Sequence, residues 1–295
     1  MEKEAFVLET QGGIGNQLFQ YAAALSIARR KSAPLLIDRW RHELPGGRPF
    51  QLSDIVDERF VTKTHHNILG ASGTRGKVMR RAFRVAARNG LVRGTYWSRC
   101  IGFDRQAYEV APPTRLVGYF QSWKYFDNST EEIFARLNAL SASVAPLNQS
   151  ADQVDSNEGS VGMHVRLGDY LSPHVRRIHP PLPAAYYEAA LSRLRDEGFG
   201  PDLLVFTDDE VEVLKLLRRI RHSFNPRIES QATSPLQTLL RLSRSTALIT
   251  ANSTFSWWGA WLASRRGVTV IAPRVWGKYW RQSDQTLLKP GWITL

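Results

Sequence analysis

His164, Arg166 and Asp169 stand close together in a segment that reads VGMHVRLGDY. Residues 161–165 alternate between apolar and other side chains, which is typical of a strand, and Gly168 begins a turn. The three polar side chains are therefore expected at the carboxyl end of a strand, the edge where open α/β sheets bind ligands. The guanidinium of Arg166 offers a planar fork of donors suited to two phosphate oxygens. The pattern alone also fits a strand in which Arg166 and Asp169 only brace the turn.

Polar side chains follow two other predicted strands. Asp208 and Asp209 come directly after an apolar run, where carboxylates bind a metal, a ribose or a base, or cap the next helix. Capping is the expected role of Asp209. Asn252, Ser253 and Thr254 lie between a predicted strand and a predicted helix, where small hydroxyl residues form an anion-binding cap.

A glycine-rich turn at residues 11–17 separates a short predicted strand, residues 6–8, from a predicted helix, residues 18–30. Free backbone N–H groups at a helix N-terminus favour an anion, although tight packing explains such glycines equally well. Leu18 holds the place of the third glycine in the dinucleotide-binding fingerprint, so this turn is a different motif.

Four stretches resemble motifs of the bacterial and animal α-1,2-fucosyltransferases that use GDP-fucose. They are GGIGNQLFQYA, GYFQSWKYF, HVRLGDY and ANSTFSWWGAWL, in the order in which the family has them. The last is nearly letter for letter, and its tryptophans are expected to pack the helix rather than to bind a ligand. Leu167 and Leu236 depart from the family, which usually has an arginine and an acidic residue there.

The resemblance implies an inverting, metal-independent transfer of L-fucose from GDP-β-L-fucose to the 2-hydroxyl of a terminal galactose, in an O-antigen or another surface glycan. It also implies an α/β fold of two Rossmann-like domains in the GT-B arrangement. A Pro-, Asn- and Ser-containing linker at residues 145–159 places the boundary. Residues 1–150 would then form the acceptor-side domain, and residues 151–295 would bind GDP-fucose.

Site roles follow from the same resemblance. Arg166, Asp169 and His164 are expected to be catalytic. By its position in the loop that follows, His174 is a rival for the base that takes the acceptor proton. Asp208 is expected to accept hydrogen bonds from guanine. The expected donor-binding residues are Gly13, Gly15, Asn16, Arg166, Asp208, Asn252, Ser253, Thr254 and Phe255. The chain lacks the Asp-x-Asp pairing of metal-dependent glycosyltransferases, so we expect no metal and no other cofactor.

The chain of 295 residues carries 39 Lys and Arg against 27 Asp and Glu, a net charge of +12. Such an excess indicates an anionic partner. No nucleic-acid motif is present, but a polyanion- or glycan-binding protein without transferase activity fits the charge as well. Cys100 is the single cysteine, which excludes an intrachain disulfide. No apolar stretch reaches the length of a membrane span, so we expect a cytoplasmic protein, either free or peripheral at the inner face of a bacterial plasma membrane.

Residues 77–88 are predicted to form an amphipathic helix. Its apolar side chains share one face, and the opposite face is basic, with Lys77, Arg80, Arg81, Arg84 and Arg88. A helix of this kind either lies on an anionic membrane or is an ordinary solvated surface helix, and the sequence favours neither.

Overall fold

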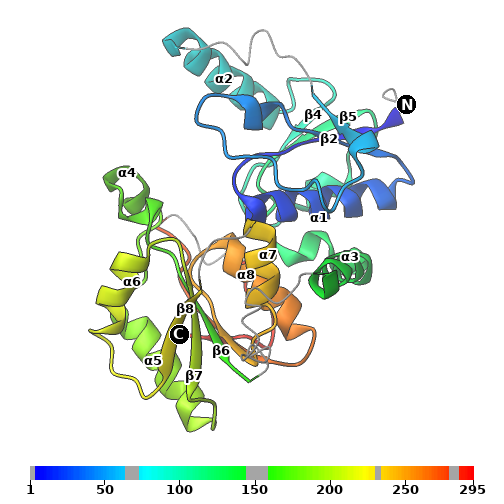
Figure 1. Cartoon of the computed structure of the whole chain (residues 1–295). Coiled ribbons are helices and arrows are strands. Elements are labelled where there is room, and N and C mark those ends of the chain that lie inside the picture. Colours follow the sequence, from blue (N-terminus) through cyan, green and yellow to red (C-terminus); the bar gives the residue numbers. More distant parts are fainter. Residues whose placement is uncertain (1–3, 64–72, 144–158, 230–233, 279–285) are drawn as a thin grey trace. The chain divides into compact units, whose positions relative to one another are not determined.

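The computed structural model describes residues 4–63, 73–143, 159–229, 234–278 and 286–295. The chain divides into two compact units, Met1–Ile133 with Asp284–Leu287, and Phe134–Ser283 with Leu288–Leu295. The boundary predicted at residue 150 lies outside the described residues. Each unit contains one sheet of parallel strands (Figure 1).

The first unit has a five-stranded sheet in the order β3-β2-β1-β5-β4. Its strands are β1 (Phe6–Glu9), β2 (Leu35–Asp38), β3 (Val61–Thr62), β4 (Thr95–Trp97) and β5 (Thr114–Val117). Its helices are α1 (Ile14–Arg30) and α2 (Gly73–Arg88), and α3 (Thr130–Ser143) begins in this unit. Nearly every side chain of α1 up to Ala28 is buried, which accounts for the long apolar run of this helix.

Helix α1 begins four residues earlier than the sequence predicts, at Ile14 rather than Leu18. The N–H of Gln17 donates to the carbonyl of Gly13 at 3.0 Å and closes a first helical turn within the glycine-rich segment. Strand β5 stops at Val117, and Phe120 in the GYFQSWKYF motif has a φ of +51°. That left-handed conformation does not occur within a strand.

The second unit has a six-stranded sheet in the order β11-β10-β9-β6-β7-β8. Its strands are β6 (Val161–Val165), β7 (Asp202–Thr207), β8 (Asn225–Glu229), β9 (Ala247–Ile249), β10 (Thr269–Ala272) and β11 (Ile293–Thr294). Its helices are α4 (Pro173–Arg176), α5 (Ala184–Asp196), α6 (Glu210–Leu217), α7 (Pro235–Leu242) and α8 (Thr254–Ser264).

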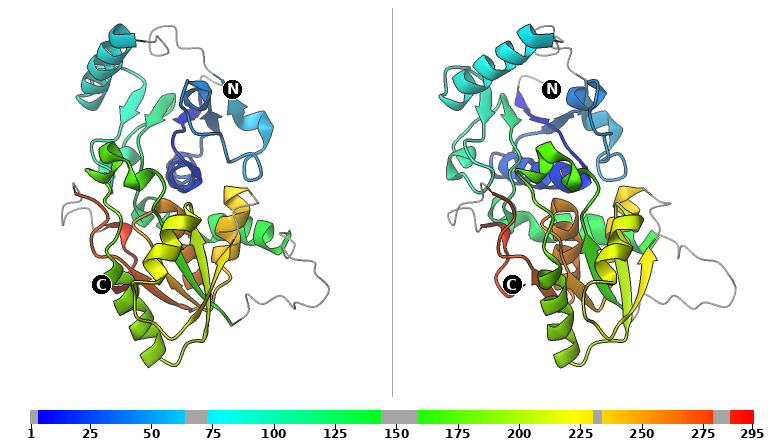
Figure 2. Two further views of the ribbon diagram at one scale, coloured as in Figure 1. Left: turned by 60° about the vertical axis from the view of Figure 1, so that its left-hand side comes forward. Right: turned by 90° about the vertical axis from the view of Figure 1, so that its left-hand side faces the viewer.

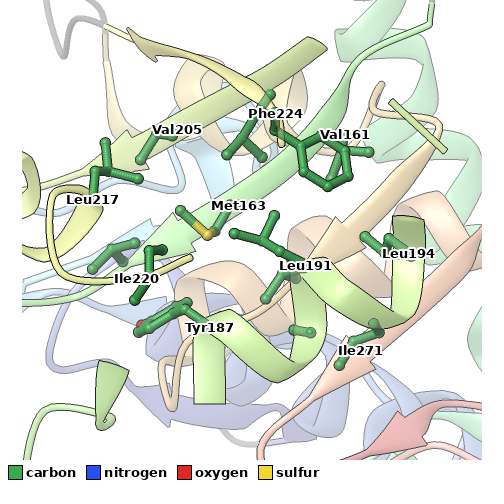
Figure 3. Packing of buried hydrophobic residues seen from close by; sticks show 14 of the residues in the cluster. Val161, Met163, Tyr187, Leu191, Leu194, Val205, Leu217, Ile220, Phe224 and Ile271 are labelled. Carbon is green, nitrogen blue, oxygen red and sulfur yellow. The ribbon is translucent and has the colours of Figure 1, made fainter. Parts of the chain in front are cut away.

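This sheet has a hydrophobic core on each face. Side chains of β6 such as Met163 pack with α5 and α6 on one face, where Tyr187 and Leu191 are almost fully buried (Figure 3). The other face packs against α7 and α8. The three tryptophans of α8 are 0% exposed, so the predicted packing role is confirmed. Helices on both faces of a parallel sheet define a Rossmann-like unit, and the predicted α/β class with two such units is confirmed.

Candidate active site

The strand order of the second sheet reverses at β6. The chain runs from β6 outward through β7 to β8, and then returns to the other side of β6 with β9. Loops at such a switch point diverge and leave a crevice at the carboxyl edge, where open α/β sheets bind ligands. Arg166 follows β6, Asp208 follows β7 and Asn252 follows β9. The structure therefore brings these three predicted residues to one edge.

Arg166 is held by two carboxylates. One terminal nitrogen donates to Asp169 Oδ1 at 2.8 Å, and the other lies 3.0 Å from Asp208 Oδ2. The side chain of Arg166 is 23% exposed. Pairing on two sides restricts the guanidinium to one orientation, and the remaining exposure leaves it accessible to an anionic ligand.

Asp208 also shapes the loop that carries Arg166. Its Oδ1 accepts hydrogen bonds from the backbone N–H groups of Leu167 at 2.8 Å and Gly168 at 3.1 Å. A Cβ on Gly168 would lie 2.5 Å from Asp208 Oδ2, so only glycine fits. The side chain of Leu167 is buried in the core, where an arginine would lack water around its charge.

Tyr170 also lies at this edge and was not predicted from the sequence. Its hydroxyl donates to the carbonyl of Asn252 at 3.0 Å and so ties the loop after β6 to the loop after β9. The guanidinium carbon of Arg166 lies 5.6 Å from the centre of the Tyr170 ring, and the ring of His179 stacks on it at 5.7 Å. Burial raises the pKa of the Tyr170 hydroxyl to about 12, so the hydroxyl remains a donor at neutral pH. Its position as the last residue of the HVRLGDY motif is the signal that could have indicated it.

The loop after β9 caps helix α8. Ser253 is the N-cap residue, and its Oγ accepts a hydrogen bond from the N–H of Phe255 at 3.3 Å. Asn252 is buried, and its amide donates to the carbonyl of Pro180 at 2.9 Å. Thr254 is the first residue of the helix and is partly exposed. The positive end of the helix dipole therefore lies at the same sheet edge as Arg166 and favours negative charge there.

His164 lies inside the unit. It is 4% exposed, and its ring packs against Phe255 with 5.0 Å between centroids. Its Nδ1 is buried and finds no hydrogen-bond partner among the described residues. Burial, with a smaller contribution from the charge of Arg166, lowers the pKa of His164 to about 3. The imidazole is therefore neutral at physiological pH.

The other predicted groups of the second unit have simpler surroundings. Asp209 caps α6, since its Oδ1 accepts from the N–H of Glu212 at 3.0 Å, and the predicted capping role is confirmed. His174 lies in the short helix α4 and is exposed.

Gly13, Gly15 and Asn16 lie at the carboxyl edge of the first sheet, where the order reverses between β1 and β5. Gly13 is the N-cap of α1, and Asn16 Oδ1 accepts from the amide of Gln121 at 2.8 Å. Gly12 has a φ of +82°, and a Cβ there would lie 2.6 Å from the Asn16 amide. The turn is therefore built to hold Asn16 in place.

Buried charges at the ends of β1 and β2 were not anticipated from the sequence. Glu9 and Asp38 are 2% and 0% exposed. Arg115 lies 2.6 Å from Asp38 and 3.6 Å from Glu9, and Arg41 pairs with Glu9. These pairs balance the buried carboxylates, because an unpaired buried charge would be strongly destabilising.

Within the described residues, no group of three or more His, Cys, Asp or Glu side chains is arranged to hold a metal ion. Among the same residues, no helix is both long and apolar enough to cross a membrane.

Comparison with protein families gives a match to the family described as Glycosyl transferase family 11 over residues 103–295. Two proteins of Escherichia coli are each 26% identical. One is the O-antigen biosynthesis glycosyltransferase WbnK, matched over 96% of this chain and 98% of the relative. The other is an alpha-1,2-colitosyltransferase, matched over 92% of this chain and 91% of the relative.

Solved structures with partial similarity include a mutant of Arabidopsis thaliana FUT1 in complex with GDP. Its TM-score is 0.48 at 13% identity, over 91% of this chain and 70% of that one. NodZ alpha-1,6-fucosyltransferase soaked with GDP-fucose has a TM-score of 0.47 at 16% identity, over 88% of this chain and 93% of that one.

Proposed function

The chain belongs to glycosyl transferase family 11, and from that premise we propose that it transfers L-fucose from GDP-β-L-fucose to the 2-hydroxyl of a terminal galactose, with inversion and without a metal. The observation that carries the proposal is the position of Arg166, clamped by two carboxylates at the switch point beside the N-terminus of α8. In this proposal residues 151–295 bind the donor and residues 1–150 bind the acceptor.

Two charges develop when the bond between fucose and GDP breaks. The leaving diphosphate becomes more negative, and the anomeric carbon becomes oxocarbenium-like. In this proposal Arg166 contacts the β-phosphate, and the Ser253–Thr254 end of α8 adds hydroxyl and dipolar stabilisation. Because these groups are already oriented, they stabilise the charge of the leaving group as it forms.

Inversion requires a group that takes the proton of the acceptor hydroxyl. We propose Asp169 as this base, because its side chain is 39% exposed beside Arg166. The exposed His174 is the rival. Gly13, Gly15 and Asn16 are proposed as further donor-binding residues.

A colitosyl nucleotide should also be tested as the donor, because the two relatives are equally similar to this chain. The alpha-1,2-colitosyltransferase is 26% identical, as is the O-antigen glycosyltransferase. Colitose lacks one hydroxyl of fucose, so a site that hydrogen-bonds this hydroxyl would reject the colitosyl donor strongly.

The O-antigen relative also supports a lipid-linked acceptor glycan. We propose that the enzyme acts in the cytoplasm, at the inner face of a bacterial plasma membrane.

A panel of sugar nucleotides and galactosides tests the proposal. We expect GDP release and a fucosylated product only with GDP-fucose and a β- or α-galactoside, and an α-linkage to O2 by NMR. A product on another hydroxyl would overturn the linkage, and preference for a colitosyl donor would overturn the donor sugar. Donor binding without turnover on any galactoside would favour a glycan-binding protein that lacks transferase activity.

A further inference from the structure

One part of the first unit is dense in positive charge. Residues 59–103 contain ten Lys and Arg residues and no Asp or Glu, whereas the whole chain has a net charge of +12. Helix α2 (Gly73–Arg88) lies within this segment, at the periphery of the first unit (Figure 2). An unopposed basic segment of this size produces a local positive potential that attracts anions.

One side of α2 is fixed to the sheet. The ring of Phe83 meets the ring of Trp97 in β4 edge to face, with 6.3 Å between centroids, and Ala87 is buried. The guanidinium of Arg84 lies 5.4 Å from the centre of the same Trp97 ring. This anchoring determines which side chains α2 presents to the solvent.

The outward side of α2 combines apolar and basic side chains in two parallel rows. Val78 and Val85 are 62% and 54% exposed and stand two turns apart. Arg81 and Arg88 are exposed with the same spacing, and their row lies roughly 60° around the helix from the valines. Leu91, directly after the helix, is 76% exposed. Exposure of such a row of apolar side chains to water is unfavourable, and clustered exposed apolar side chains mark interaction surfaces.

Helix α6 in the second unit provides a comparison within the same chain. It also exposes two apolar side chains, Val211 at 64% and Leu214 at 45%. Its first turn is acidic, however, and Lys215 pairs with Glu212 at 2.5 Å. Of these two helices, α2 is the one that combines exposed apolar side chains with arginines in a segment without an acidic residue.

We propose that the outward face of α2, formed by Val78, Arg81, Val85, Arg88 and Leu91, binds the surface of a membrane rich in anionic lipids. The arginines would contact lipid phosphates, and the valines and the leucine would enter the boundary of the acyl chains. A nucleic acid or a charged glycan would satisfy the arginines but would leave the apolar side chains in water. The inference adds a membrane-contact surface to the proposed function and rests on its location at a membrane, but not on the transfer reaction.

Vesicle sedimentation of the full chain tests this surface, with vesicles of phosphatidylcholine alone and of phosphatidylcholine mixed with phosphatidylglycerol. We expect binding to the mixed vesicles only, weakening as salt rises. Arg81→Gln with Arg88→Gln should weaken binding about 30-fold, and Val78→Ser with Val85→Ser roughly tenfold. The matched controls are Arg218→Gln with Arg219→Gln, and Val211→Ser, at exposed positions in or beside α6, and they should bind like the parent.

Three results would overturn the inference. They are absence of binding to the anionic vesicles at low salt, equal loss in the control variants, and loss in the arginine variant with none in the valine variant. The last result, together with binding to an oligonucleotide or to heparin, would identify a polyanion surface instead. Transfer to a soluble galactoside is measured in parallel and should be unchanged in all variants. Its failure in the parent protein would contradict the proposed function while leaving the vesicle result valid.

Discussion

The guanidinium of Arg166 is restrained from three sides, by Asp169, by Asp208 and by the ring of Tyr170. A side chain held in this way loses little further conformational entropy when it binds phosphate. The same restraints make the site sensitive to the shape of the cation, because a lysine reaches one partner at a time whereas an arginine reaches several.

Arg166→Lys is therefore expected to retain little activity. Losing one donor to the transition state typically costs about 2.7–4 kcal/mol, or roughly 100- to 1,000-fold in kcat. Initial rates with GDP-fucose and a galactoside, measured for Arg166→Lys and Arg166→Ala, check this expectation. Near-parental turnover in the lysine variant would show that bidentate contact with the phosphate is not required.

Asp208 was predicted to accept hydrogen bonds from guanine. In the structure, one carboxylate oxygen accepts hydrogen bonds from two backbone N–H groups, and the other pairs with Arg166. We therefore expect Asp208→Asn to lower the affinity for GDP and for ADP by a similar factor. The reason is that the loop that carries Arg166 is held less firmly without the Asp208 carboxylate. Calorimetric titration of both nucleotides measures this. Asp209→Asn is the matched control, since asparagine caps a helix about as well as aspartate. A loss confined to GDP in Asp208→Asn would instead support the guanine contact.

At the scale of elements, periodicity and apolar composition predicted the strands that build the site, because β6, β7 and β9 are buried. The strands that the sequence did not indicate include β4 and β8. Strand β8 begins with exposed residues that include Pro226, and β4 has three half-buried residues. Both lie at the edge of a sheet and pair with one neighbour only. Edge strands are less buried, so their sequences lack the apolar pattern that predicts a strand.

The burial of His164 in β6 couples folding to pH. Its pKa is about 3 in the folded chain and near 6.5 when unfolded, so between these values the unfolded chain binds a proton that the folded chain does not. The free energy of unfolding therefore falls as pH decreases below 6.5, by up to about 1.4 kcal/mol per pH unit from this residue. Urea denaturation at several pH values should show a shallower dependence for His164→Phe, which keeps a ring against Phe255. Replacement of the exposed His174 serves as the control, and identical slopes for the parent and His164→Phe would contradict the assignment.

At the scale of the whole molecule, residues far apart in the sequence gather because parallel strands all end at one edge. Arg166, Asp208 and Asn252 were predicted to share a site for this reason, and the second sheet brings them together. Their individual contacts were not predictable. The bond from Tyr170 to the carbonyl of Asn252 and the two N–H groups bound by Asp208 depend on loop conformations. Such conformations are determined by packing rather than by local pattern.

The charge of the leaving group leads to the last prediction, which concerns metal dependence. A divalent cation beside the diphosphate would need carboxylates of the protein to hold it. The two carboxylates that follow β7 already have other partners, since Asp208 binds Arg166 and the loop after β6, and Asp209 caps α6. In the proposed function, Arg166 and the N-terminus of α8 stabilise the diphosphate instead. We therefore expect the initial rate to be unchanged in EDTA, and Mg²⁺ or Mn²⁺ to raise it by less than about twofold. The fucosylated product must be detected directly, because coupling enzymes for GDP themselves need a metal. An activity lost in EDTA and restored by either cation would mean that a carboxylate of this edge is a metal ligand.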